Sequence, residues 1–152
     1  MNQRACATAQ SQRQPDFEVV AALLSYGERI CLLRRSPEVS SDKGLWHCVT
    51  GYLPPAQRPF DQALLEIDEE TGIGASSLEL ADSAVFDEPD AHGNLWRVHA
   101  FHFHCGTEAV RLNWEHDGAC WVSGEQLRAL PTVAWLDRVM RALLKPARTD
   151  TH

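Results

Sequence analysis

The chain has 152 residues, enough for one domain with a substantial core and short for two. Its formal net charge of −7 at pH 7 disfavours a nucleic-acid polymer as the main ligand, because such ligands need a basic protein surface. No apolar run approaches the ~20 residues that span a bilayer, and the polar N-terminus lacks the apolar segment of a signal peptide. We therefore expect a cytoplasmic protein without a membrane partner, with one domain at 16–146 between a flexible N-terminal tail, 1–15, and a C-terminal tail, 147–152.

Five cysteines are scattered through the chain without the CxxC spacing of a metal or redox motif. Their odd number and the lack of a secretory signal favour reduced thiols. Four of them lie in apolar runs, where we expect small core residues, with a catalytic cysteine as the alternative. They are Cys31, Cys48, Cys105 and Cys120; the fifth is Cys6.

The first third of the chain predicts three strands. Two apolar runs, 16–25 and 29–34, flank a turn that contains a glycine, which is typical of a hairpin. The polar segment 36–44 holds a proline and predicts a loop. A third strand over 45–50 leads to Gly51, where we expect a turn.

A proline-rich loop follows, and then a predicted helix. Pro59 suits the first helical position, where its missing N–H costs nothing, and Gly72 suits the left-handed residue that ends a helix. Between them, residues at the spacing i, i+3, i+4, i+7 form an apolar stripe for the core. These are Phe60, Ala63, Leu64 and Ile67.

The second half of the chain predicts four strands and then two helices. The strands are expected at 78–86, 95–105, 110–112 and 119–122, with a turn cluster at 88–94 and a loop at 113–118. Ser123 and Gln126 have the spacing of a capping box for a helix to Leu130. A last helix is expected over 132–144. The order β-β-β-α-β-β-β-β-α-α predicts an α/β fold with helices on the faces of a mixed sheet.

The predicted helix that ends at Gly72 concentrates negative charge. Glu66, Glu69 and Glu70 stand at i, i+3 and i+4 and so share one helix face. Like charges at this spacing destabilise a helix, most of all near its negative C-terminal end. A divalent cation bound through oxygen is the obvious group to neutralise them.

The stretch from Gly51 to Ile73 resembles the Nudix box, G-x5-E-x7-R-E-U-x-E-E-x-G-U, where U is aliphatic. Seven of its nine specified positions match, and the resemblance extends over residues 16–144. The matches are Gly51, Glu66, Ile67, Glu69, Glu70, Gly72 and Ile73. The departures are Gln57, where the family has Glu, and Leu65, where it has Arg.

The resemblance implies an α/β/α sandwich with a central mixed sheet that hydrolyses a diphosphate joined to another moiety, with Mg²⁺ or Mn²⁺ as cofactor. It implies that Glu69 and Glu70 bind the metal and that Glu66 is a metal ligand or a base. The carbonyl of Thr50 is expected to complete the metal site. Glu115, just before a strand, is expected to be a further ligand or the general base, so that Glu66, Glu69 and Glu115 carry catalysis.

In the family, the Glu and the Arg that are missing here form polar contacts that orient the catalytic carboxylate. With Gln57 and Leu65 in their places, neither charge is left unpaired, and losing both costs less than losing one. We expect intact metal ligands with weaker support around them, and therefore slower turnover or a greater need for metal.

Several residues are candidates for substrate contact. Arg34, Arg35 and Arg97 could meet phosphate, with surface salt bridges as the alternative for each, and His47 and Tyr52 are also assigned to the substrate. Strand histidines are expected beside the substrate cleft, with a zinc site as the alternative. They are His99, His102 and His104.

The segments 46–51 and 115–121 resemble the pyrophosphohydrolases of dihydroneopterin triphosphate and dATP, and also dinucleoside polyphosphate hydrolases. A small phosphorylated substrate of nucleotide or pterin type is therefore expected; ADP-ribose stays open, and so does a homodimer. An isomerase of isopentenyl diphosphate is disfavoured because its cysteine motif is missing. The rival hypothesis is an inactive Nudix domain that binds a nucleotide or a partner.

Overall fold

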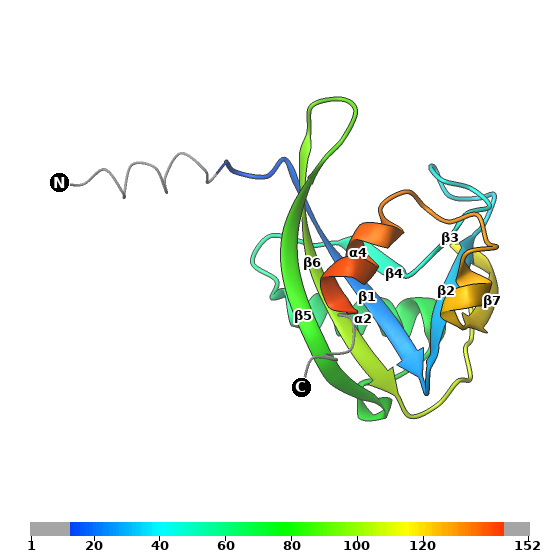
Figure 1. Cartoon of the computed structure of the whole chain (residues 1–152). Helices are drawn as coiled ribbons and strands as arrows, with labels where there is room; N and C mark the ends of the chain where they lie inside the picture. The colour runs from blue at the N-terminus through cyan, green and yellow to red at the C-terminus, as the bar shows by residue number, and fades with distance from the viewer. Residues whose placement is uncertain (1–12, 145–152) are drawn as a thin grey trace, which may run out of the picture.

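The computed structural model describes residues 13–144, so most of the two predicted tails lies outside the described residues. Seven strands form one mixed sheet, and helices pack against both of its faces (Figure 1). The strand order along the main path is β3-β2-β1-β6-β5, while β4 pairs with β1 and β7 pairs with β2. The expected α/β/α sandwich with a central mixed sheet is confirmed.

Strand β1, Phe17–Tyr26, is the centre of the sheet. It runs parallel to β6, Leu95–Cys105, and antiparallel to β4. Its residues from Val19 to Ser25 are all buried, as expected for an apolar strand covered on both faces. At its far end it forms the predicted hairpin with β2, Arg29–Arg35, through the pairs Ser25–Ile30 and Tyr26–Arg29.

The single strand predicted over 45–50 is two strands. β3, Trp46–His47, pairs with β2, whereas β4, Val49–Tyr52, pairs with β1. The split follows from the divergence of β1 and β2 beyond their hairpin, because one short segment must bridge the two. Gly51 therefore lies within β4, opposite Val20, and the predicted turn at this glycine is wrong.

The second half of the sheet holds two long strands and one shorter one. β5, Leu78–Pro89, pairs with β6 along its length, and β7, His116–Val122, pairs with β2. The strand predicted over 110–112 is absent from the described residues. The N–H of Arg111 donates instead to the carbonyl of Thr71, at 2.8 Å, so this segment joins the end of a helix.

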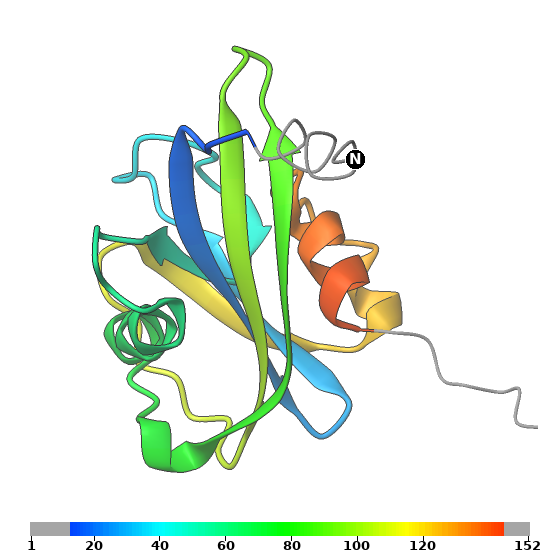
Figure 2. The ribbon, with the colours of Figure 1, turned by 90° about the vertical axis from the view of Figure 1, so that its left-hand side faces the viewer.

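Helix α2, Pro59–Thr71, covers one face of the sheet, and α4, Leu136–Leu143, covers the other (Figure 2). Alternate residues of β1 serve the two resulting cores, as the period of a strand requires. The core under α2 includes Val20, Ala22, Leu24, Ile67 and Phe103. The core under α4 includes Val19, Ala21, Leu23, Leu136 and Val139.

The predicted ends of α2 are confirmed, since Pro59 opens it and Gly72 ends it at φ 77°. Ala63 and Ile67 are buried as expected, while Phe60 in the first turn stays 38% exposed. A short 3-10 turn, Ala75–Ser77, leads into β5.

The last two helices are shorter than predicted. α3, Gly124–Leu127, has the expected capping box between Ser123 and Gln126. The segment before α4 is held by β3, because Thr132 bridges Trp46 and the N–H of Val133 donates to the carbonyl of Trp46. Within residues 13–144, no helix is long and apolar enough to cross a membrane.

Candidate metal centre

The site is built where β4 meets α2. A Cβ atom at Gly51 would collide with the carboxyl group of Glu66, so the missing side chain of this glycine leaves the space that the carboxyl group occupies. The amide of Gln62 donates to Oε2 of Glu66 at 2.8 Å, one turn away on the same helix. Glu66 is thereby fixed between the helix and the strand.

The three glutamates of α2 differ in their surroundings. Glu70 is 2% exposed, Glu66 is half-buried, and Glu69 is exposed. The exposure of the three carboxyl groups therefore varies around the helix rather than along it. Each carboxyl group has a different free-energy cost of carrying charge.

Burial, a hydrogen bond with Glu66 and the charges of Glu66 and Glu115 together raise the pKa of the Glu70 carboxyl to about 10, with burial the largest cause. The backbone of Thr50 opposes the shift through a hydrogen bond to Glu70. Burial also raises the pKa of Glu66. Without a cation, Glu66 and Glu70 thus hold a proton between them, and two anions would need an opposing charge.

Glu115 reaches this helix from the other half of the chain. Ser36, at the end of β2, donates its N–H to the carbonyl of Glu115 at 2.9 Å and its hydroxyl to the carbonyl of Trp114 at 2.8 Å. The side chain of Asn113 accepts from the N–H of Glu115 at 3.0 Å. These bonds hold the turn at a place where the charge of Glu115 acts on Glu66 and Glu70.

The residue types fit a hard divalent cation. The donors are carboxylate oxygens, which Mg²⁺ and Mn²⁺ prefer, and Oε1 of Glu70 is buried without a hydrogen-bond partner. Across residues 13–144, no three His, Cys, Asp or Glu side chains are gathered closely enough to hold a metal ion. For three of these acids to hold one ion, their side chains would have to move closer together.

The arginines assigned to phosphate have different partners. Arg34 pairs with Asp117 at 2.7 Å and lies over the ring of Trp46. Arg35 donates through Nε to the carbonyl of Ser41 at 2.9 Å and forms no ion pair with any residue of 13–144. Of Arg34, Arg35 and Arg97, only Arg35 therefore has a charge that is not paired within residues 13–144.

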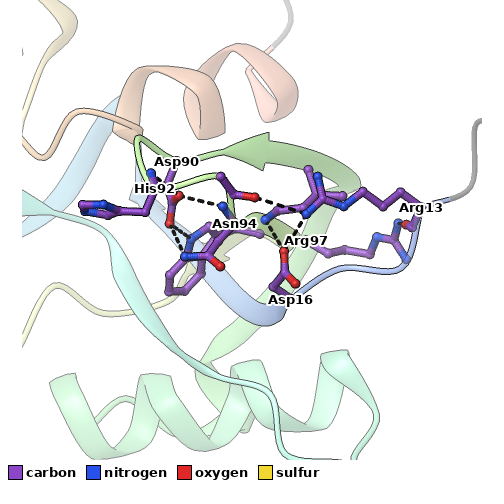
Figure 3. A network of polar contacts seen from close by, with 9 residues as sticks. Arg13, Asp16, Asp90, His92, Asn94 and Arg97 are labelled. Carbon is purple, nitrogen blue, oxygen red and sulfur yellow. Dashed lines mark hydrogen bonds and ion pairs between the residues drawn. The ribbon is translucent and has the colours of Figure 1, made fainter.

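Arg97 belongs to a polar network at the β5–β6 hairpin (Figure 3). It pairs with Asp87 at 2.8 Å and donates to the carbonyl of Arg13 at 3.5 Å. Arg13 in turn pairs with Asp16 at 2.8 Å. These contacts tie the start of the chain to the hairpin, which is a structural use of Arg97.

Tyr52 and His47 lie in opposite environments. Tyr52 is 65% exposed and lies 6.0 Å from the ring of Trp96, which stacks on Phe17 at 4.4 Å. His47 is 2% exposed, packs edge-on against Trp135 at 4.6 Å, and has two ring nitrogens without a partner. Tyr52 is accessible to a ligand, whereas His47 is enclosed.

The strand histidines have partners within the fold. His102 and His104 both bond the hydroxyl of Ser25, at 3.0 and 2.8 Å, and His99 pairs with Glu18 at 2.8 Å. No role was predicted for His116, whose Nε2 lies 3.9 Å from Oε1 of Glu70. Its position next to Glu115 was the available signal.

A family model described as NUDIX domain matches residues 15–143 of this chain. The CTP pyrophosphohydrolase of Escherichia coli (strain K12) is 31% identical over 118 residues, which cover 76% of this chain and 82% of that protein. An octanoyltransferase of Myxococcus xanthus is 33% identical over 117 residues; the match covers 75% of this chain but only 32% of that longer protein.

Solved structures share the fold. The MutT protein from Methanosarcina mazei Go1 is 27% identical with a TM-score of 0.63, over 84% of this chain and 91% of that one. The NUDIX domain of Shewanella oneidensis NrtR, complexed with ADP ribose, has a TM-score of 0.67 at 14% identity, over 92% of this chain and 95% of that one. The family model covers nearly all the described residues, and this chain belongs to the Nudix hydrolase family.

Proposed function

We propose that this protein hydrolyses a diphosphate bond in a small nucleotide-like molecule with the help of Mg²⁺ or Mn²⁺. The observation that carries the proposal is the buried Glu70, which lies beside Glu66 and within reach of the charge of Glu115. A fold gains nothing from gathering three acids at one helix unless a positive charge joins them.

The proposed cation ligands are Glu66, Glu69, Glu70 and the carbonyl of Thr50. Bound there, the ion would neutralise phosphoryl oxygens and lower the pKa of the attacking water. Glu115, held in its turn by Ser36, is the proposed general base that takes a proton from this water. Glu70 is proposed to contribute a negative charge to the cation from the buried side of the site.

We assign substrate contacts to side chains that are exposed or whose charge is not paired within the fold. Arg35 has no ion pair with the described residues and is the first candidate for a phosphate oxygen, with Arg34 beside it in the chain. The exposed Tyr52 could stack against the base or ring of the substrate. Substrate contacts by Arg97 and His47 stay predictions, because Arg97 is paired with Asp87 and His47 is enclosed.

A nucleoside triphosphate is the proposed substrate class. It is supported by the CTP pyrophosphohydrolase that shares 31% identity with this chain over most of its own length. Dihydroneopterin triphosphate and ADP-ribose are the compounds against which this choice is tested. A role as a binding module is the second candidate, because Leu65 is 48% exposed and supplies no charge to the site.

The test is turnover on CTP, dATP, dihydroneopterin triphosphate and ADP-ribose with Mg²⁺ and with Mn²⁺, with the products analysed for phosphate and pyrophosphate. Glu69→Gln is expected to abolish most of the turnover. Asp68→Asn, which changes an exposed acid of the same helix, is the matched control and is expected to leave it unchanged. Absence of turnover on every compound, together with measurable nucleotide binding, would favour the binding module.

A further inference from the structure

Four buried side-chain atoms in residues 13–144 have no hydrogen-bond partner, and all belong to one cluster. They are Nδ1 and Nε2 of His47, Nδ1 of His116 and Oε1 of Glu70. The three side chains are 2%, 6% and 2% exposed, respectively. We call them the buried His-Glu cluster.

The sheet brings the two imidazoles close to the same part of β2. His47 pairs with Leu33 and His116 pairs with Arg35, two residues further along β2, after a register shift between Arg34 and Arg35. The distance from His116 to Glu70, a residue of α2, places the imidazole of His116 at the end of this helix. His47 lies at the edge of the sheet, where its ring packs against Trp135.

A buried polar atom without a partner reduces stability, and apolar side chains of similar size would avoid this loss. Elsewhere in the described chain, buried side-chain polar atoms have partners. The concentration of unpaired atoms next to Glu70 points to a role in the site rather than in the fold.

The distance between His116 and Glu70 favours a hydrogen bond that forms on a small movement. Nε2 of His116 lies 3.9 Å from Oε1 of Glu70, about 1 Å beyond the usual N–H···O length. His116 follows Glu115 directly, and its N–H donates to the carbonyl of Asn113 in the same turn at 3.3 Å. The turn that places Glu115 therefore also places His116.

We propose that His116 is a positioning residue that donates from Nε2–H to Oε1 of Glu70 and fixes the orientation of this carboxylate toward the cation. This role rests on the proposed function of the site. It supplies support from β7 where the box has lost charged residues at Gln57 and Leu65. Histidine and carboxylate partners of metal ligands commonly act in this way.

The test compares three substitutions of His116 in the full chain. His116→Gln keeps an N–H donor at nearly the position of Nε2, His116→Asn has a donor that is too short to reach Glu70, and His116→Leu has none. The primary readout is the affinity for Mn²⁺ without substrate, measured by electron paramagnetic resonance. Far-UV circular dichroism and thermal unfolding without metal establish which variants fold.

We expect His116→Leu and His116→Asn to bind Mn²⁺ about 10–100-fold more weakly, and His116→Gln to stay within about threefold of the unsubstituted protein. The Mn²⁺ concentration for half-maximal turnover should rise in parallel, while kcat at saturating Mn²⁺ changes less. His92→Leu, which removes an exposed imidazole from the β5–β6 turn, is the control and should bind Mn²⁺ normally.

Each outcome decides a different point. Normal Mn²⁺ affinity in His116→Asn, or equal weakening in the Gln and Asn variants, would overturn the donor role of His116 and leave the proposed function standing. Failure of the unsubstituted protein to bind Mn²⁺ would overturn both. The Gln–Asn comparison decides the matter even if His116→Leu does not fold.

Discussion

Two carboxyl groups of this molecule, Asp90 and Glu70, are held in opposite ways. Asp90, in the turn between β5 and β6, accepts from the backbone N–H groups of His92 and Asn94 and from Nε1 of Trp96, at 2.8, 2.9 and 2.9 Å (Figure 3). These bonds hold the pKa of Asp90 well below its usual range, and the bond from Trp96 has the largest effect. Glu70 is buried with Oε1 unpartnered, and its pKa is raised to about 10.

The difference separates a carboxylate that closes a turn from one that we propose binds a cation. Donors around Asp90 have already stabilised its charge, so a further positive ion would gain little there. The charge of Glu70 is opposed by burial and by neighbouring acids, so a positive ion would gain much. The number of acids in a region is therefore less informative than whether their charges are already satisfied.

Closing the space at Glu66 is expected to affect both metal binding and turnover. Gly51→Ala places a methyl group in the space of the Glu66 carboxyl, which is the end of a flexible side chain and must turn away from the strand. Turnover and Mn²⁺ affinity should both fall, because Glu66 must move. Gly74→Ala is the control, since a Cβ there meets no atom within 4 Å. If both variants behaved alike in thermal unfolding and in Mn²⁺ titration, the contact between Gly51 and Glu66 would not matter for metal binding.

The pH dependence of stability should differ between the two acids. The pKa of Glu70 rises on folding from 4.5 to about 10, so the folded protein keeps a proton that the unfolded chain releases. Its contribution to stability is therefore full below pH 4.5 and declines as pH rises toward 10, by at most about 1.4 kcal/mol per pH unit. Thermal unfolding without metal between pH 5 and 9 should show this decline, and Glu70→Gln should flatten it. An unchanged slope in the variant would show that Glu70 is not held protonated.

The smallest effect is expected at the hairpin. Asp90→Asn keeps the shape of the side chain but removes its charge, which four donors now stabilise. The melting temperature should fall, while Mn²⁺ affinity and turnover stay unchanged because the hairpin holds no proposed ligand. A loss of Mn²⁺ affinity in Asp90→Asn would contradict the assignment of Asp90 to a structural role and of Glu70 to metal binding. Asp68→Asn serves as the reference for removal of one exposed charge.

Local signals in the sequence predicted helix α2 well. Pro59, Gly72 and the periodicity of Ala63 and Ile67 act within a few residues, and the structure has both ends where they indicate. The same holds for the capping box at Ser123, although α3 ends sooner than predicted.

Features that depend on distant contacts were not predictable in this way. The division between β3 and β4 depends on the divergence of β1 and β2, and the segment around Arg111 is held by Thr71 at the end of α2. Glu115 was reached through the family resemblance alone. The approach of His116 to Glu70 depends on the pairing of β7 with β2, two segments far apart in the chain, and the hydrophobic periodicity of the sequence does not indicate this pairing.

The central claim is that the acids of α2 bind a divalent cation through Glu70 and use it for hydrolysis. The most direct measurement is a Mn²⁺ titration of the unsubstituted protein and of Glu70→Gln, followed by electron paramagnetic resonance, with turnover measured on the same samples. We predict saturable binding that is lost in the variant, with a fall in turnover larger than the 10–100-fold typical of residues that only support metal ligands. Equal Mn²⁺ binding and equal turnover in the two proteins would contradict the claim.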